Sequence, residues 1–127
     1  METIKVPAEY QQMMAYLILP DAAGFLKFMQ TVFGATEKMV HLRDDNKTIM
    51  HGELKLGEVV VMFAESGKEY PPTPGSFFIY VNDADKTFAE AIANGASEIQ
   101  APADREYGRS GGVKDPFGNT WWVTSVK

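Results

Sequence analysis

A histidine, whose side chain titrates near neutral pH, stands two residues before a carboxylate in this sequence. His51 and Glu53 lie in the run Met50-His51-Gly52-Glu53, and the alternation of a β-strand would put both on one face. A histidine beside a carboxylate can act as a general acid and base. The pair could instead supply two ligands of a divalent metal, with His41 as a third, since catalytic metal sites commonly use three. A purely structural, hydrogen-bonded role for His51 is the remaining alternative.

Aromatic residues at alternating strand positions form a second group that could bind a ligand. Trp122, Tyr80 and Phe78 alternate with residues assigned to the opposite side of their predicted strands. Aromatic rings bury a large area and stack on planar or cationic groups. The alternative for each ring is packing in a core.

Arg109 is a candidate for binding an anionic group, because the glycine-rich segment Gly108–Gly112 around it would let a ligand approach closely. Its planar guanidinium could bind a carboxylate or a phosphate. An ion pair with Glu53 or with a surface acid is the alternative. The segment leads into a strand and a turn rather than a helix, so it does not indicate a phosphate-binding loop.

These candidates lie on an internal repeat. Leu17-Ile18-Leu19-Pro20-Asp21 and Ile79-Tyr80-Val81-Asn82-Asp83 both have the pattern of a strand that ends in Asp. A helix about three turns long and a glycine follow each of them, at an offset of about 61 residues. The repeat predicts two similar modules with a ligand site between them.

Each half of the chain has the pattern β-α-β-β-β. The helices are predicted to start after the caps Asp21 and Asp83 and to stop at Gly34 and Gly95. The predicted strands cover residues 13–19, 37–43, 49–56 and 58–64 in the first half, and 76–81, 97–100, 107–114 and 120–126 in the second. We expect a single domain over residues 1–127, with module 1 at about 11–64, a connector at 65–75, and module 2 at about 76–127. Residues 101–105 are predicted to be a loop, and 115–119 a tight turn.

A tight turn at Leu56-Gly57 would fix the register of the hairpin before the connector. The face that should carry the helix would then contain the pairs Leu54 with Val59, Gly52 with Val61 and Met50 with Phe63. The opposite face would pair Glu53 with Val60 and His51 with Met62. Such a half-polar face suits a small-molecule cup, and a dimer interface or a second small core are its alternatives.

Composition narrows the classes of function. The chain has 127 residues, a net charge of −5 and no cysteine. No disulfide or thiolate metal site can form, and no basic stripe indicates nucleic-acid binding. No apolar stretch reaches the ~20 residues needed to cross a membrane, and the N-terminus lacks the apolar core of a signal peptide. We therefore expect a cytoplasmic protein with neither nucleic acid nor membrane as a partner.

Two βαβββ copies that close with Asp115-Pro116-Phe117-Gly118-Asn119 resemble the vicinal oxygen chelate superfamily, which includes glyoxalase I, bleomycin-resistance proteins, fosfomycin-resistance enzymes and extradiol dioxygenases. The run Met50-His51-Gly52-Glu53 before a hairpin, with an Arg before the Asp-Pro-Phe-Gly turn, resembles the PhnB-like branch. The resemblance covers nearly the whole chain. It implies an α+β fold in which two βαβββ modules form a half-open cup, usually in a homodimer.

The resemblance also implies where a metal would bind. In metal-dependent members, His, Gln or Glu side chains hold a divalent ion at positions that correspond here to Met14, Met62, Ser76 and Trp122. None of these side chains is a ligand for a hard or borderline divalent metal, because a thioether suits soft ions. We therefore expect a protein with no metal and no cofactor.

The resulting hypothesis is a metal-free protein that binds or sequesters a small organic ligand in an aromatic cup. Its predicted ligand-binding residues are Trp122, Tyr80, Phe78, His51, Met62 and Arg109. The alternative is an enzyme, either a divalent-metal-dependent lyase or isomerase like glyoxalase I, or a metal-free acid–base catalyst that uses His51 and Glu53. A third hypothesis is a protein whose cup is closed by dimerisation and that serves only in assembly.

Overall fold

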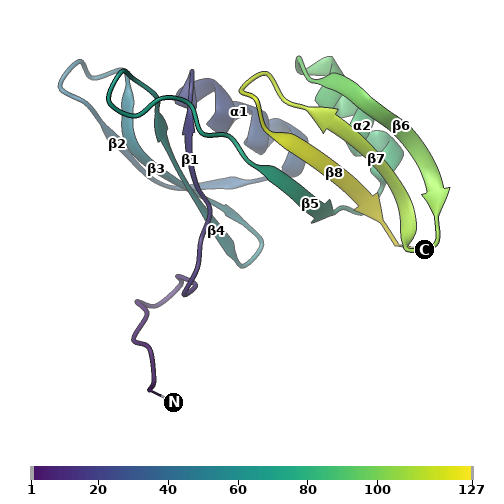
Figure 1. The fold of residues 1–127 in the computed structure, drawn as a ribbon, viewed down its shortest axis with the longest axis horizontal. Helices are drawn as coiled ribbons and strands as arrows, with labels where there is room; N and C mark the ends of the chain where they lie inside the picture. Colours follow the sequence, from purple (N-terminus) through teal and green to yellow (C-terminus); the bar gives the residue numbers. More distant parts are fainter. Residues whose placement is uncertain (1, 127) are drawn as a thin grey trace. The chain divides into compact units, whose positions relative to one another are not determined.

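The computed structural model describes residues 2–126, which form two helices and eight strands in chain order (Figure 1). The first half contains β1 (Tyr16–Leu19), α1 (Ala22–Phe33), β2 (Thr36–Leu42), β3 (Ile49–Leu56) and β4 (Val59–Glu65). The second half contains β5 (Ser76–Tyr80), α2 (Ala84–Ala93), β6 (Ser97–Arg105), β7 (Gly108–Lys114) and β8 (Thr120–Ser125). The predicted β-α-β-β-β pattern is confirmed in both halves.

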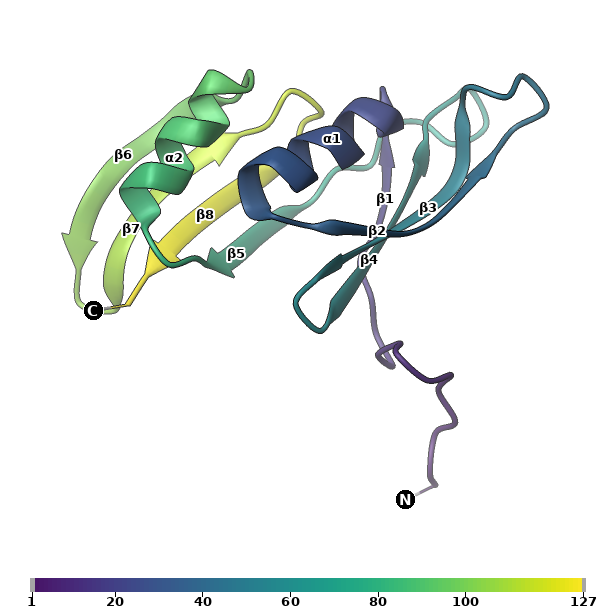
Figure 2. The same ribbon diagram turned by 180° about the vertical axis from the view of Figure 1, so that it is seen from behind.

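The chain forms two compact units. The first runs from the N-terminus to Gln30 and from Gly34 to Thr73, and the second comprises Thr31–Phe33 and the chain from Pro74 onward. Each unit contains one four-stranded sheet, with strand orders β1-β4-β3-β2 and β5-β8-β7-β6 (Figures 1 and 2). In each sheet the first strand pairs in parallel with the last, and the other pairs are antiparallel. The fold is therefore α+β with two open sheets, as the sequence predicted.

The helices begin and end where the sequence predicted. The side chain of Asp21 accepts a hydrogen bond of 3.0 Å from the backbone N–H of Gly24 at the start of α1. Gly34 follows the helix in the left-handed region with φ 71°, where glycine has no steric penalty. The predicted apolar stripe of α1 is buried, and it consists of Phe25, Phe28, Met29 and Val32. The ring of Phe25 lies 5.4 Å from that of Phe63 on β4, so this stripe packs on the sheet.

The predicted pairing of the β3–β4 hairpin is wrong, because the turn lies one residue later in the chain than expected and Leu54 pairs with Val61 instead of Val59. Leu56 pairs with Val59, which leaves Gly57 and Glu58 as the turn, and Gly57 takes a φ of 57° that suits glycine. Phe63 consequently pairs with Gly52 rather than with Met50. Each residue therefore pairs two positions away from its predicted partner. Because side chains alternate with a period of two, the assignment of side chains to the two sides of the sheet is still correct.

Two further predictions about the strands, one in each sheet, are wrong. Met50 was expected under the helix but is exposed, since the pairing of β3 with β4 begins only at Gly52. Residues 101–105 were expected to be a loop but belong to β6, whose pairing with β7 shifts register on both sides of Gln100. These irregularities hide the alternation of polar and apolar residues on which the prediction depended.

The turn before β8 has the predicted geometry. Asp115 donates its backbone N–H to the carbonyl of Asn119 at 2.8 Å, and Gly118 has a φ of 100°. The turn directs β8 so that the buried Trp121 and Val123 point to one side of the second sheet and Trp122 to the other. Helix α2 packs against β6, β7 and β8 of this sheet (Figure 2).

Neither helix in the described part of the chain is both long and apolar enough to span a membrane.

Candidate functional site

The face of the first sheet away from its apolar core brings together three chemically active side chains, those of Glu53, His51 and Tyr16. Glu53 pairs with Met62 across β3 and β4, and Met62 pairs with Tyr16 across β4 and β1. His51 lies two residues before Glu53 and therefore shares its side of β3. The predicted acid–base pair thus lies beside a tyrosine that the sequence analysis did not select.

These side chains form a continuous chain of hydrogen bonds. Tyr10 donates its hydroxyl to Glu53 Oε1 at 2.5 Å, and the other carboxylate oxygen, Oε2, lies 2.8 Å from His51 Nε2. On the far side of the imidazole, Nδ1 lies 3.0 Å from the hydroxyl of Tyr16. The order of groups is therefore Tyr10, Glu53, His51 and Tyr16, and both ring nitrogens of His51 have a partner.

The charge on Glu53 decides which nitrogen of His51 carries the proton. Glu53 is buried, with 3% of its surface exposed, and burial alone would raise its pKa. Hydrogen bonds from Tyr10 and His51, together with the positive charge of Lys38, outweigh burial and lower the pKa of Glu53. The carboxylate is thus ionised and can only accept, so Nε2 donates to it. In the neutral form of the imidazole, Nδ1 is then the nitrogen that accepts from the Tyr16 hydroxyl.

Tyr10 belongs to the segment before β1, which several contacts attach to the β3–β4 hairpin. The side chain of Gln11 donates to the carbonyl of Glu58 at 3.1 Å and accepts from the N–H of Val60 at 3.1 Å. It therefore bonds to the backbone of the turn and of the start of β4, before Met62, where the pairing of β4 with β1 begins. The ammonium of Lys38 lies 4.8 Å from the centre of the Tyr10 ring. The hydrogen bond to Glu53 raises the pKa of Tyr10, which keeps this hydroxyl protonated as a donor.

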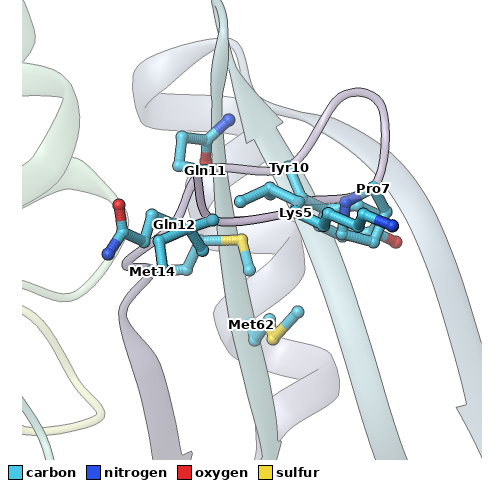
Figure 3. Close-up of a pocket in the computed structure, with 9 residues that line it drawn as sticks. Lys5, Pro7, Tyr10, Gln11, Gln12, Met14 and Met62 are labelled. Atoms are coloured by element: carbon cyan, nitrogen blue, oxygen red, sulfur yellow. The ribbon is translucent and has the colours of Figure 1, made fainter. Parts of the chain in front are cut away.

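An open pocket of about 340 Å³ lies between this N-terminal segment and β4. Figure 3 shows Met62, which projects from β4, and Met14 near it, with Tyr10 and Pro7 on another side. The complete lining consists of Ile4, Lys5, Val6, Pro7, Tyr10, Gln11, Gln12, Met14 and Met62. Tyr10 is therefore shared between the pocket and the hydrogen-bond chain.

The second sheet presents aromatic side chains where the first presents the hydrogen-bond chain. Phe78 pairs with Trp122 across β5 and β8, and Tyr80 follows Phe78 on the same side of β5. The ring of Phe78 lies 5.3 Å from Tyr80 and 6.0 Å from Tyr107. Phe78, Tyr80 and Tyr107 are 51%, 66% and 56% exposed, so this aromatic cluster lies open. The sequence analysis predicted three of its four members and missed Tyr107.

Trp122 lies flat against the sheet because its cross-strand neighbour has no side chain. A Cβ atom on Gly112 would come within 2.4 Å of the Trp122 ring. The indole therefore occupies the space above Gly112, and Trp122 is half-buried.

Arg109 does not lie beside Trp122. It pairs with Ser125 across β7 and β8, which puts it on the side of the sheet that carries α2. There its guanidinium donates to both carboxylate oxygens of Asp85 on α2, at 2.7 and 3.0 Å, and lies 3.4 Å from Asp104. These contacts raise the pKa of Arg109 and lower that of Asp85. The structure thus favours the ion-pair alternative for this residue and does not group it with the aromatic cluster.

The residues at the family's metal positions do not fit a divalent metal. Met14 and Met62 line the pocket, and Ser76 and Trp122 lie in the second sheet. His41 is opposite His51 in the β2–β3 register, yet among residues 2–126 no three His, Cys, Asp or Glu side chains gather as a metal site would require. His51 would also have to give up one of its two hydrogen bonds to bind an ion. The predicted third ligand is therefore not in place.

The sequence matches the family model of the glyoxalase/bleomycin resistance protein/dioxygenase superfamily over residues 11–123. Among solved structures, TioX from Micromonospora sp. ML1 is 26% identical, with a TM-score of 0.74 and coverage of 92% of this chain and 99% of TioX. A putative 3-demethylubiquinone-9 3-methyltransferase, the PhnB protein from Bacillus cereus, is 16% identical (TM-score 0.73, coverage 91% and 100%). The fosfomycin resistance protein FosX from Mesorhizobium loti is 17% identical (TM-score 0.67, coverage 92% of each chain). The comparison with curated proteins gave no significant match.

Proposed function

This chain belongs to the glyoxalase/bleomycin resistance protein/dioxygenase superfamily, and within it we propose that the protein binds a small planar organic molecule without a metal. The aromatic cluster of the second sheet, formed by Phe78, Tyr80, Tyr107 and Trp122, is the proposed binding surface. One observation carries the proposal, namely that the ring of Phe78 contacts those of Tyr80 and Tyr107 while all three are about half exposed or more. Large aromatic side chains left open on a sheet commonly mark a place where another molecule binds.

Charge favours a cationic ligand over an anionic one. The chain carries a net charge of −5, and the faces of aromatic rings attract positive groups. Arg109, which could have bound an anionic group, is paired with Asp85 and Asp104. A planar cation that stacks on Phe78 and Tyr80 is therefore the ligand class that this surface suits best.

The test is a calorimetric titration with two planar probes of opposite charge, ethidium as the cation and 8-anilinonaphthalene-1-sulfonate as the anion. We expect ethidium to bind more tightly, and we expect Tyr80→Ala to weaken its binding about tenfold, since one stacking contact contributes roughly 1 kcal/mol or more. Tyr70→Ala is the matched control, because Tyr70 is as exposed as Tyr80 but lies outside the cluster.

Two outcomes would reject this surface as the binding site. One is binding that Tyr80→Ala and Trp122→Ala leave unchanged. The other is a loss of binding that Tyr70→Ala reproduces, which would indicate nonspecific adsorption to exposed aromatic side chains.

The finer classification is also part of the proposal. The run Met50-His51-Gly52-Glu53 supports a place in the PhnB-like branch, and the similarity to the Bacillus cereus PhnB protein agrees with it at the level of the fold. We propose a cytoplasmic homodimer, as the family resemblance implies. Light scattering on the eluted protein tests the assembly, because a chain of 14.1 kDa would give twice that mass as a dimer.

A second candidate function is metal-free acid–base catalysis at His51 and Glu53. The observation that favours it is the 2.8 Å contact of His51 Nε2 with a buried carboxylate whose pKa is lowered. A carboxylate in this position orients an imidazole and stabilises its protonated form, which is the arrangement that general bases use. An activity that is lost in both His51→Gln and Glu53→Gln, while both variants stay folded, would support this function.

A further inference from the structure

We propose that the hydroxyl of Tyr16 is the group through which the His51–Glu53 pair reacts, as a nucleophile toward small electrophilic carbonyl compounds. This inference rests on the second candidate function, acid–base catalysis at His51 and Glu53. It adds the identity of the reacting atom and the class of compound, neither of which the pair itself specifies.

His51 has no free ring nitrogen. Nε2 donates to Glu53 at 2.8 Å, and Nδ1 lies 3.0 Å from the Tyr16 hydroxyl. A substrate therefore cannot reach a ring nitrogen of His51 without replacing one of these partners. The proton that His51 is placed to accept is the phenolic proton of Tyr16.

The three side chains differ in their access to solvent. Glu53 is 3% exposed, His51 is half-buried, and Tyr16 is 48% exposed. Exposure increases along the chain of hydrogen bonds from the carboxylate to the phenol. Tyr16 is thus the member of the triad that a molecule arriving from solvent meets first.

The three groups match the arrangement of roles in known catalytic triads. In hydrolases that use a hydroxyl, an imidazole and a carboxylate, the carboxylate fixes the tautomer of the imidazole, which in turn takes the proton of the hydroxyl. Glu53, His51 and Tyr16 are hydrogen-bonded in this order. The cluster therefore combines a positioned base with an exposed oxygen nucleophile.

The reaction with an activated ester can be written in full. The Tyr16 oxygen attacks the carbonyl carbon of p-nitrophenyl acetate, the new C–O bond forms, and the bond to p-nitrophenolate breaks. The phenolic proton passes to Nδ1 of His51, and the imidazolium that forms is stabilised by the carboxylate of Glu53 before it releases the proton to water. The products are O-acetyltyrosine at position 16 and p-nitrophenolate.

Other tyrosines of the same chain serve as internal controls. Tyr107 is 56% exposed, slightly more than Tyr16, and its ring contact is with Phe78 rather than with a base. Tyr10 donates to the carboxylate of Glu53, which raises the pKa of its phenol and should slow its reaction. Exposure alone predicts that Tyr107 reacts at least as fast as Tyr16, whereas the proposal predicts the reverse.

The experiment is brief treatment of the full chain with p-nitrophenyl acetate, followed by peptide mass spectrometry that measures acetylation at each tyrosine. We expect Tyr16 to be acetylated at least about tenfold faster than Tyr107, a modest part of what a positioned general base supplies. In His51→Gln the rate at Tyr16 should fall to that of Tyr107. His41→Gln is the matched control, since it removes the cross-strand histidine outside the hydrogen-bond chain and should leave the rate unchanged.

Equal rates at Tyr16 and Tyr107 in the unmodified chain would overturn the proposal, and this comparison needs no variant to fold. Fast acetylation of Tyr16 that persists in His51→Gln would overturn it as well. Release of p-nitrophenolate tests the underlying function separately. If p-nitrophenolate release depends on His51 but Tyr16 is not acetylated, acid–base catalysis is supported and Tyr16 is rejected as the nucleophile. If the unmodified chain releases p-nitrophenolate no faster than the His51→Gln variant does, both the catalytic function and the role of Tyr16 are rejected.

Discussion

Glu53 shows how a buried charge is kept ionised in the first sheet. Removal from water opposes ionisation, but two hydrogen bonds and the nearby Lys38 more than compensate, and the pKa falls below its ordinary value of 4.5. A group whose pKa is lower in the folded state stabilises the fold fully above the unfolded-state pKa. That contribution disappears as the pH falls through the folded-state pKa.

This linkage predicts the pH dependence of a single substitution. Glu53→Gln should lower the free energy of unfolding by about 1–3 kcal/mol at pH 7, because hydrogen bonds to a charged acceptor are replaced by weaker ones. The difference from the unmodified chain should narrow as the pH falls below about 4.5. Urea unfolding followed by circular dichroism at several pH values measures it, with the exposed Glu69→Gln as control. A difference that is constant down to pH 3 would mean that the pKa of Glu53 is not lowered.

A second buried carboxylate, Asp115, has a structural role instead. It accepts hydrogen bonds from the backbone N–H groups of Phe117 and Asn119, the side-chain amide of Asn119 and the indole N–H of Trp121, at 2.8–2.9 Å. Asp115→Ala would leave these donors unsatisfied in a buried turn, so we expect a loss of about 3 kcal/mol or more in unfolding free energy. Asp44→Ala, in an exposed turn, should change stability by less than about 0.5 kcal/mol. Equal effects of the two substitutions in chemical denaturation would contradict this role.

The residues that complete the acid–base cluster were hard to find from the sequence for identifiable reasons. Tyr16 lies inside the apolar run from Met13 to Leu19 that predicted a buried strand, whereas the strand begins only at Tyr16 and, within it, only Leu17 and Leu19 are fully buried. Tyr10 lies in a segment without strand or helix periodicity, and its partner Glu53 is 43 residues away. Contacts made by irregular segments leave no local pattern to detect.

At the scale of elements, register explains both a success and an error. In the β3–β4 hairpin the turn was predicted one residue too early, so each predicted partner was two residues from the observed one. The predicted sides of the sheet were nevertheless correct, because side chains alternate between the two sides with a period of two. Arg109 was predicted to bind a ligand together with the aromatic residues, whereas it lies on the side of the sheet that carries α2; the glycines around it show no alternation that would have indicated its side. The pairing of Lys114 with Thr120 beside the Asp115–Asn119 turn, counted back along both strands, would have placed Arg109 opposite Ser125. The side on which Arg109 lies could therefore be predicted from the position of the turn, but not from the residues of the strand itself.

Close cross-strand packing against a glycine predicts the outcome of another substitution. A Cβ atom at Gly52 would lie 2.5 Å from the fully buried ring of Phe63, its partner in the β3–β4 pair. Gly52→Ala should therefore force the ring or the strands to move and lower the unfolding free energy by about 1–3 kcal/mol. Gly67→Ala is the matched control, since nothing lies within 4 Å of a Cβ atom there. Thermal unfolding compares the two, and a neutral Gly52→Ala would show that the ring has room to shift.

At the scale of the whole molecule, the two modules use equivalent positions for different chemistry. Tyr16 and Met62 pair in the first sheet as Phe78 and Trp122 do in the second. Glu53 is the β3 partner of Met62, whereas Gly112 is the β7 partner of Trp122. A carboxylate in one module thus corresponds to a glycine in the other, where the missing side chain makes room for an indole. The two modules thus share one fold, while one carries a polar cluster and the other an aromatic one.

This divergence leads to a prediction about metal content. Met14, Met62, Ser76 and Trp122 occupy the positions that the family resemblance assigns to metal ligands, and they offer thioether, hydroxyl and indole groups to ions that prefer imidazole or carboxylate. After incubation with Zn²⁺, Ni²⁺ or Mn²⁺ and dialysis, we expect less than about 0.1 ions per chain by mass spectrometry, since weakly held ions are lost. A zinc enzyme taken through the same dialysis shows that tightly bound metal is retained. About one ion per chain that disappears in His51→Ala would contradict the prediction, because it would mean that His51 exchanges its bond to Tyr16 or Glu53 for a metal. That result would favour the alternative of a metal-dependent enzyme.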